Sequence, residues 1–340
     1  MKPLENLHIV EFSGLGPGPF AAMALADMGV SVTRITRPGS SAPNPGSGTF
    51  LNRGRRDVPL DLKTPEGLAA ARDLIRGADA VIEGFRPGKM ESLGLGPDDL
   101  LPLNPRLVYG RMTGWGQTGP MAHLAGHDLN YLGLTGLLSL MGEEGRPPMP
   151  PLNLISDFGG GGMYLAFGLI CAIWRAQSTG QGQVVDAAMI HGTTHLASFI
   201  HGKRAQGAWH EGRENNAVDG GAPFYRVYET RDGRYMAVAA LEPVFFATMI
   251  RTLGLDARFI AGQGDRALWP EMAEVLRQTF LTRDFDHWVA LFADVDACVT
   301  PVLNMDEAQN HPQMAGCFTT AGGVTQPGPA PRITPWAPKS

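Results

Sequence analysis

The sequence predicts an α/β fold, with a Rossmann-like large domain and a smaller α+β domain joined by long linkers. Segments typical of buried strands alternate with helical segments over about the first 110 residues. A polar, glycine-rich segment at 202–222 shows no sustained hydrophobic period, and a hairpin pattern follows it. The 340 residues, 44% apolar and 18% charged, are enough to build two hydrophobic cores.

The alternation begins at the N-terminus. The run "LHIVEF" is typical of a buried strand, "SGLGPGPFAAMALADMG" is a glycine-rich turn leading into a helix, and "VSVTRIT" is the next strand. The segment "TPEGLAAARDLIRGA" has a threonine cap, proline at the first helical position and glutamate in the first turn, which all indicate a helix start. The strands "DAVIEG" and "RLVYGRMT" follow. Such a βαβ series favours a parallel sheet.

The second half of the chain predicts a smaller unit. Two strands surround the turn "RDG" in "YRVYETRDGRYMAVAAL", and helical segments lie near 244–254 and 270–292. We therefore divide the chain into a large domain, a linker, a small domain and a tail rich in Gly and Pro that packs back on the large domain. Their predicted bounds are 1–200, 201–222, 223–309 and 310–340.

The charge and composition of the chain argue against several classes of binding partner. The formal net charge of −5, with no dense Lys/Arg stripe, argues against a nucleic-acid surface. Three widely spaced cysteines form no metal or disulfide pattern, so we expect no metal site and a reducing cytoplasm. The N-terminus, which contains two acids, does not resemble a signal peptide. The longest apolar run, "MYLAFGLICAIW", is shorter than the roughly 20 residues that span a bilayer, so we expect no membrane partner.

One candidate ligand loop is "GPGPFA", residues 16–21, which loosely fits the dinucleotide pattern G-x-G-x-x-G/A. Its prolines remove N–H donors that would hold a pyrophosphate. An NAD site would also have an acid near the end of the second strand, where this chain has Arg34 and Arg37. The pattern therefore favours a tight strand-to-helix turn, and Arg37 remains a candidate for a nucleotide phosphate.

Two segments place cations where strands end. They are "LNRGRRDVPLDLK", residues 51–63, and "EGFRPGKMESLGLG", residues 83–96. Open α/β sheets bind ligands at the carboxyl ends of their strands. Each segment alone is more often a solvated surface. Together with Arg37, they indicate an anionic, nucleotide-like ligand.

The segment "NLISDFGGGGMYLAF" places Asp157 directly before four glycines and a helical run. Glycine costs roughly 1 kcal/mol per residue in a helix. The glycines either let a ligand approach free N–H groups at a helix N-terminus, where they would stabilise an oxyanion, or pack the helix on the sheet. In "AGHDLNY", His127 is either a hydrogen-bonded core histidine or a proton-transfer partner of Asp157.

Several motifs occur in one order along the chain, namely "RMTGWGQTGP", "AGHDLNY", "PLNLISDFGGGG", "GQVVDAAM" and "LEPVFF". Together they resemble the family III CoA-transferase superfamily and, within it, the α-methylacyl-CoA racemases. The resemblance implies interconversion of (R)- and (S)-2-methylacyl-CoA thioesters by 1,1-proton transfer through an enolate. It assigns the proton transfers to His127 and Asp157, and the orientation of the histidine to Glu242. The alternative is a CoA-transferase in which Asp157 is the nucleophile.

The resemblance also implies binding partners. The substrate's CoA moiety is the only cofactor implied, and the relatives form interlocked homodimers in which two chains share an active site. At Ser92 the family pattern has an arginine, so one phosphate contact is either missing or supplied elsewhere. The residues implied to contact CoA are Arg37, Leu60, Asp61, Leu62, Lys63, Gly84, Phe85, Arg86, Gly126, Asp128, Leu129, Asn130 and Tyr131.

Overall fold

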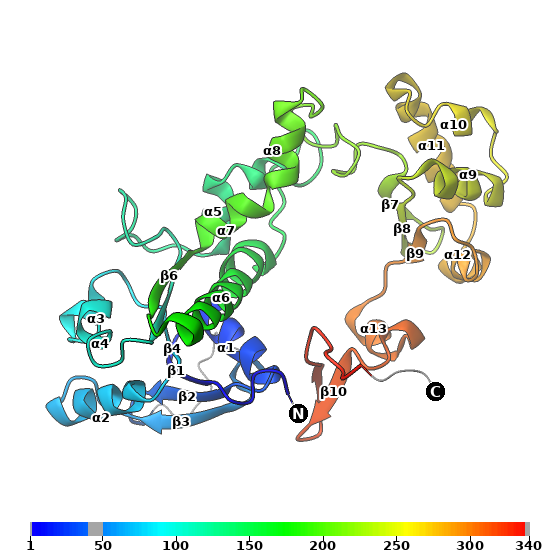
Figure 1. Ribbon diagram of the computed structural model, residues 1–340. Helices are drawn as coiled ribbons and strands as arrows, with labels where there is room; N and C mark the ends of the chain where they lie inside the picture. The colour runs from blue at the N-terminus through cyan, green and yellow to red at the C-terminus, as the bar shows by residue number, and fades with distance from the viewer. Residues whose placement is uncertain (1, 40–49, 337–340) are drawn as a thin grey trace. The chain divides into compact units, whose positions relative to one another are not determined.

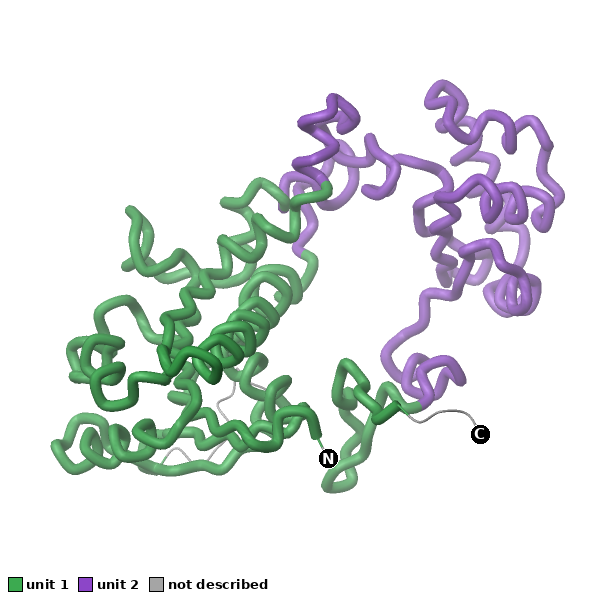
Figure 2. The backbone as a smooth tube through the Cα atoms, viewed as in Figure 1, with its two compact units in different colours: residues 1–137, 151–199, 316–340 green, residues 138–150, 200–315 purple. Residues whose placement is uncertain are grey.

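A computed structural model describes residues 2–39 and 50–336 and divides the chain into two compact units (Figures 1 and 2). Unit 1 consists of residues 1–137, 151–199 and 316–340, and unit 2 of residues 138–150 and 200–315. The end of the predicted tail, 337–340, lies outside the described residues.

Unit 1 is built on a six-stranded parallel sheet, which confirms the predicted α/β class (Figure 1). The strand order is β3-β2-β1-β4-β5-β6, the order of dinucleotide-binding Rossmann domains. The strands are β1 His8–Phe12, β2 Ser31–Thr36, β3 Arg55–Pro59, β4 Ala80–Glu83, β5 Val108–Thr113 and β6 Gln183–Ala188.

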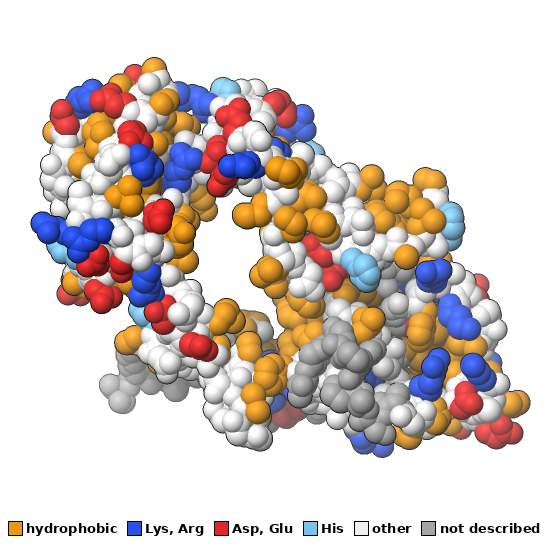
Figure 3. Space-filling model, turned by 180° about the vertical axis from the view of Figure 1, so that it is seen from behind, with side chains coloured by type: hydrophobic (Ala, Val, Ile, Leu, Met, Phe, Trp, Pro, Cys, Tyr) orange, Lys and Arg blue, Asp and Glu red, His pale blue; other side chains and the backbone are white. Residues whose placement is uncertain are grey.

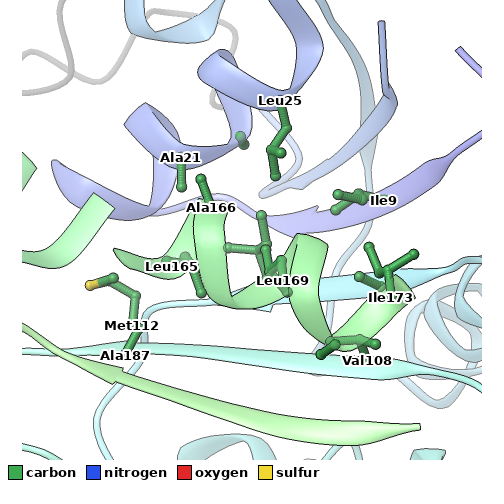
Figure 4. Close-up of a cluster of buried hydrophobic side chains, with 14 of the residues drawn as sticks. Ile9, Ala21, Leu25, Val108, Met112, Leu165, Ala166, Leu169, Ile173 and Ala187 are labelled. Atoms are coloured by element: carbon green, nitrogen blue, oxygen red, sulfur yellow. The ribbon is translucent and has the colours of Figure 1, made fainter. Parts of the chain in front are cut away.

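Helices cover both faces of this sheet, because alternate strand residues point to opposite sides. Ile9 and Ile82 belong to a cluster with Leu165 and Leu169 of α6 (Figure 4). Val81 and its neighbours on the other face pack with α2, α3 and α4. The helices of unit 1 are α1 Pro17–Asp27, α2 Pro65–Arg76, α3 Lys89–Ser92, α4 Pro97–Leu100, α5 Asp128–Leu134, the π-helix η3 Leu154–Met163, α6 Tyr164–Thr179 and α7 Met189–Leu196.

The sequence analysis did not predict strand β3. It pairs in parallel with β2 at the edge of the sheet, from Val32 opposite Arg55 to Thr36 opposite Pro59. Its residues are mostly polar, as an edge strand allows, so it lacks the apolar run that marks the central strands. Short remaining segments are η1 Phe50–Asn52 and the hairpin β10 Phe318–Ala321 with β11 Val324–Pro327.

Two arginines near β3 are structural. The side chains of Arg55 and Glu11 are 0% exposed, and Arg55 Nε lies 2.5 Å from Glu11 Oε2. Arg53 forms an ion pair with Asp27 at 2.5 Å and also donates to the carbonyl of Pro327 at 2.8 Å. The expectation that this run of cations serves an anionic ligand is therefore wrong for these two arginines.

Helices η3 and α6 follow each other directly and form a 26-residue helical stretch, Leu154–Thr179, which contains an 18-residue window with a mean hydropathy of 1.4. Within the described residues, this stretch is long and apolar enough to cross a bilayer by length and composition. The helix therefore extends well beyond the apolar run "MYLAFGLICAIW", whose length the sequence analysis considered. One side of α6, including Leu165, Leu169 and Ile173, packs into the core of unit 1, as in the core helix of a globular protein.

Unit 2 contains the three-stranded antiparallel sheet β7-β8-β9, which confirms the predicted hairpin. The predicted helical segment 270–292 is two helices, α11 and α12, and the start of the predicted linker is part of α8. The bounds are η2 Leu137–Leu140, α8 Ser198–Ala205, β7 Tyr225–Glu229, β8 Tyr235–Ala239, α9 Pro243–Thr252, α10 Arg258–Ala261, η4 Arg266–Leu268, α11 Trp269–Phe280, α12 Phe285–Phe292, β9 Val299–Pro301, α13 Met305–Asn310 and η5 Pro312–Met314.

Candidate active site

Asp157 lies in the first turns of the π-helix η3, a rare geometry that is frequent at functional sites. Its side chain is half-buried, and Asn153 Nδ2 donates to its Oδ2 at 3.3 Å. Burial raises the pKa of Asp157 and the charge of Asp128 adds to this, whereas the bond from Asn153 and the charge of His127 act in the opposite direction. The net effect is a raised pKa.

His127 occupies the N-cap position of α5. Its backbone N–H donates to Asn130 Oδ1 at 3.0 Å, which fixes the chain at the start of the helix. The residue is exposed, and its side chain is close enough to Asp157 for its charge to lower the pKa of that carboxyl. His127 is therefore not a buried core histidine, and its segment neighbours Asp157 because the adjacent Asp128 accepts the N–H of Asp157.

Asp128 connects the two segments. Its carboxylate Oδ2 accepts the backbone N–H groups of Ser156 at 2.7 Å and Asp157 at 2.8 Å. The residue is 3% exposed, so this carboxylate is an internal group. The resemblance implied that Asp128 contacts CoA, but its side chain is instead bound to the backbone of η3.

The glycines Gly159 to Gly162 pack η3 against neighbouring helices. A Cβ on Gly160 would lie 2.4 Å from Thr193 Oγ1 of α7, and a Cβ on Gly162 would lie 2.7 Å from Phe20 Cδ1 of α1. A π-helix also directs each N–H to the carbonyl five residues earlier, so these amides belong to the helix. The expectation of free N–H groups is therefore wrong. The glycines are packing positions, but against helices α1 and α7 and not against the sheet as the alternative had it.

Aromatic side chains support the loop before α5. Tyr131 is buried, its hydroxyl donates to the carbonyl of Gly126 at 2.5 Å, and its ring meets Trp115 edge-on at 4.6 Å. Burial, together with the charge of Asp157, raises the pKa of Tyr131 to about 12, so the hydroxyl stays protonated. A Cβ on Gly126 would lie 2.8 Å from both rings, so this position requires glycine. Leu129 is exposed on the same helix.

The carboxyl edge of the parallel sheet carries exposed cations. Arg37 follows β2, Lys63 lies in the loop after β3, and Arg86 follows β4. Because β2 and β3 pair in register and β4 is two strands away from β2, these loops leave the same edge of the sheet. This is where open α/β sheets bind ligands. The structure thus gathers three of the cations that the resemblance assigned to CoA.

Residues beside Lys63 and Arg86 determine how the loops that carry these cations fold. The side chains of Leu60, Leu62 and Phe85 pack partly into the core under α2, and Gly84 is exposed. Asp61 Oδ1 accepts the N–H of Lys63 at 3.0 Å, which turns the chain into α2.

Glu83 orders the turn after β4. Its Oε2 accepts the N–H of Phe85 at 2.8 Å, and its Oε1 lies 3.4 Å from Arg111 Nε. Burial raises the pKa of Glu83 to about 7, although Phe85 and Arg111 lower it. Arg111 also forms an ion pair with the partly exposed Glu91, so a charged network holds the turn at this end of the sheet.

Glu242 lies in unit 2, at the N-cap of α9. It is exposed, and its side chain makes no capping hydrogen bond. Gln263 Nε2 donates to the carbonyl of Leu241 at 2.9 Å, which holds the turn before Glu242. Glu242 is therefore an exposed residue of unit 2, on a turn that a hydrogen bond holds in place.

Comparisons with known proteins show the family. Residues 4–332 match the model of CoA-transferase family III. The chain belongs to CoA-transferase family III. This confirms the resemblance found in the sequence.

Several relatives of this family III chain have names or solved structures. The alpha-methylacyl-CoA racemases of mouse and human are 43% and 44% identical to it, over 99% and 97% of this chain and 88% and 86% of theirs. The crystal structure of a CaiB/BaiF family protein from Brucella suis superposes with a TM-score of 0.82 at 27% identity, over 98% of this chain and 93% of that one.

Sequence reasoning missed two contacts of this family III site. Asn153, the donor to Asp157, stands four residues before it, but an asparagine in a polar loop gives no signal of such a bond. The turn at Gly16 also reaches the site, since a Cβ there would lie 3.7 Å from Asp157 Oδ2. The prediction for "GPGPFA" was a tight turn, whereas Gly16 is the N-cap of α1 and residues 17–21 are its first turn; no link to Asp157 was expected.

Proposed function

We propose that this chain is an α-methylacyl-CoA racemase, which interconverts (R)- and (S)-2-methylacyl-CoA thioesters. The observation that carries the proposal is the pairing of His127 with a half-buried Asp157 of raised pKa in one site. The mouse and human racemases, at 43% and 44% identity, support this choice of reaction. The proposal needs no cofactor other than the CoA moiety of the substrate.

The reaction requires a base on each side of the α-carbon. A thioester acidifies its α-hydrogen because sulfur donates weakly into the carbonyl. One residue removes the α-proton, the C–H electron pair passes into an enolate, and the other residue returns a proton to the opposite face. His127 and Asp157 exchange these roles with the direction of the reaction. The raised pKa of Asp157 favours the protonated form needed in one direction.

The CoA moiety is bound, in this proposal, at the carboxyl edge of the sheet. Arg37, Lys63 and Arg86 supply positive charge for its phosphates. The loop from Gly126 to Tyr131 lies next to the catalytic residues and contacts the pantetheine end.

The active site is completed, in this proposal, by a second copy of the chain in an interlocked homodimer. Glu242 of one copy then orients the imidazole of His127 in the other, as an orienting carboxylate does in other enzymes. Exposed apolar side chains support such an interface (Figure 3). On α6, Phe167 is 70% and Trp174 is 77% exposed, and Phe199 on α8 is also exposed.

The test uses chirally pure (S)-2-methylacyl-CoA in D2O, with configuration and α-deuterium followed together. We expect epimerisation with deuterium uptake, and loss of epimerisation in both His127→Ala and Asp157→Ala. Glu242→Gln should reduce the rate by about 10²-fold, and mixing it with His127→Ala should restore part of the activity if the site is shared between subunits.

The alternative is a CoA-transferase with Asp157 as nucleophile, and a parallel tube with a free-acid acceptor tests it. CoA passing to the acceptor without α-deuterium uptake, abolished by Asp157→Ala and not by His127→Ala, would contradict the racemase.

A further inference from the structure

Asp128 links the two residues of the proposed proton-transfer pair. It follows His127 directly at the start of α5, and its Oδ2 accepts the N–H groups of Ser156 at 2.7 Å and Asp157 at 2.8 Å. The residue is 3% exposed, so water does not compete for these bonds. One side chain thus joins the backbone that carries one base to the backbone that carries the other.

We propose that Asp128 is a positioning residue, which fixes the separation of His127 and Asp157 and keeps a negative charge behind Asp157. This inference rests on the proposed racemase function. Two bases that act on opposite faces of one carbon must hold their spacing, because a misplacement of about 1 Å costs about 10²-fold in rate. Within the described residues, Asp128 is the side chain that bonds both segments.

A buried hydrogen bond from α7 also holds the chain next to Asp157. Thr193 of α7 is 0% exposed, and its hydroxyl donates to Ser156 Oγ at 3.1 Å. The N–H of Ser156 is one of the two that Asp128 accepts. The chain just before Asp157 is therefore bound from two sides, by α5 and by α7, and it has little freedom to shift.

The charge of Asp128 acts on Asp157 in the direction that the reaction needs. Burial is the largest cause of the raised pKa of Asp157, and Asp128 raises it further. His127 opposes this, since its positive form favours the ionised carboxylate. The elements packed against η3 carry further titratable or charged side chains, whereas α1 has none before Asp27. They are Tyr131 on α5, His191 and His195 on α7, Tyr164, Cys171 and Arg175 on α6, Tyr109 and Arg111 on β5, and Asp186 on β6.

The experiment separates the two effects of Asp128 with two variants of the full-length chain. Asp128→Asn keeps an oxygen that can accept both N–H groups and removes the charge. Asp128→Ala removes both. Asp219→Asn is the control, because Asp219 Oδ1 accepts the N–H groups of Asn216 at 2.8 Å and Gly221 at 3.0 Å in unit 2.

Three measurements are made on each variant: kcat and KM for α-deuterium exchange, the pH profile of kcat/KM, and amide hydrogen exchange of the peptide 153–163. For Asp128→Asn, we expect the acid limb of the profile to move to lower pH by about half a unit to one unit. For Asp128→Ala, we expect kcat to fall by about 10²-fold, KM to change less than about threefold, and faster exchange at 153–163. The control should retain the wild-type profile.

The results distinguish this inference from the proposed function. If wild type exchanges the α-hydrogen but Asp128→Asn keeps the wild-type profile and Asp128→Ala loses only stability, the inference is wrong and Asp128 is a structural cap. If wild type shows no exchange, the racemase proposal fails, and unchanged amide exchange at 153–163 in Asp128→Ala would overturn the positioning role as well. Should Asp128→Ala not fold, the pH profile of Asp128→Asn decides.

Discussion

Gly160 of η3 lies directly against Thr193 of α7, so closely that a Cβ on Gly160 would be 2.4 Å from Thr193 Oγ1 and 2.7 Å from its backbone nitrogen. The second of these neighbours is backbone, which cannot rotate away. We therefore expect Gly160→Ala to force η3 and α7 apart and to reduce the free energy of unfolding by about 1–3 kcal/mol. Urea unfolding followed by circular dichroism measures this loss.

Gly159 provides the matched control for this prediction. A Cβ there would meet the Leu154 carbonyl oxygen at 3.2 Å and Leu196 Cδ1 at 3.4 Å, contacts that a small shift relieves. Gly159→Ala should therefore lose less than about 1 kcal/mol. Equal losses in both variants would show that the fit between η3 and α7 does not decide the stability.

A second prediction concerns the stability cost of Asp157. Its pKa in the folded chain is raised, first by burial, so the folded state binds more protons than the unfolded state between the two pKa values. The free energy of unfolding then falls as pH rises through that interval and stays lower above it. Asparagine does not ionise, so Asp157→Asn should lack this fall in the free energy of unfolding. We expect its Tm to exceed that of wild type at pH 8 by about 1–2 °C, with no difference near pH 3.5.

Asp73→Asn is the control for that experiment, because Asp73 is an exposed carboxylate whose side chain is 74% accessible. It should show the same Tm as wild type at both pH values. A Tm for Asp157→Asn below wild type at pH 8 would mean that the ionised carboxylate stabilises the fold, contrary to the direction of its pKa.

A third prediction concerns the exposed cations at the carboxyl edge of the sheet. Lys63→Gln and Arg86→Gln should each raise KM for the acyl-CoA by about 10-fold, with kcat nearly unchanged, because a charge-assisted bond to phosphate contributes about 1.5–3 kcal/mol. The effect should shrink at 0.5 M salt. Arg76→Gln, at the C-terminal end of α2 and paired with Asp73, is the control. An unchanged KM in both variants would place CoA elsewhere.

The sequence predicted the strands of the sheet best where they are apolar. The runs around β1, β4 and β5 are buried on both sides, which leaves a continuous apolar signal, and β2 is buried mainly at Val32, Thr33 and Ile35. Edge strand β3 gives no such signal, because its residues are half solvated. The same polarity made Arg55 resemble a ligand-binding residue, although it is buried against Glu11.

The residues proposed to react could be picked out from the sequence, but the contacts that hold them could not. His127 and Asp157 can be picked out because they lie in the motifs "AGHDLNY" and "PLNLISDFGGGG". The hydrogen bonds of Asp128 to the backbone of η3 join residues 28 and 29 positions apart, and no local pattern encodes such a contact. The four glycines correctly predicted that another group lies close to the backbone of η3, but that group is the helices α1 and α7. A run of glycines shows that something lies close to the backbone, but the sequence does not tell whether it is a neighbouring helix or a ligand.

The last prediction concerns Glu83, whose carboxylate lies between the N–H of Phe85 and the guanidinium of Arg111. Burial raises its pKa from the ordinary 4.5 to about 7. The folded chain therefore holds a proton that the unfolded chain has lost between these values, and the free energy of unfolding falls as pH rises from about 5 to 8. We expect Glu83 to account for about 1–3 kcal/mol of this fall, and Glu83→Gln to show a fall smaller by that amount.

Glu91→Gln is the control, because Glu91 also pairs with Arg111 but its side chain is 44% exposed. It should keep the wild-type fall between pH 5 and 8, since Glu83 still titrates. Glu83→Gln retains an oxygen for the N–H of Phe85, so the turn that carries Arg86 should keep its shape and KM for the acyl-CoA should stay within about twofold of wild type. A fall of wild-type size in Glu83→Gln would assign the pH dependence to another buried group, such as Glu11 beside Arg55.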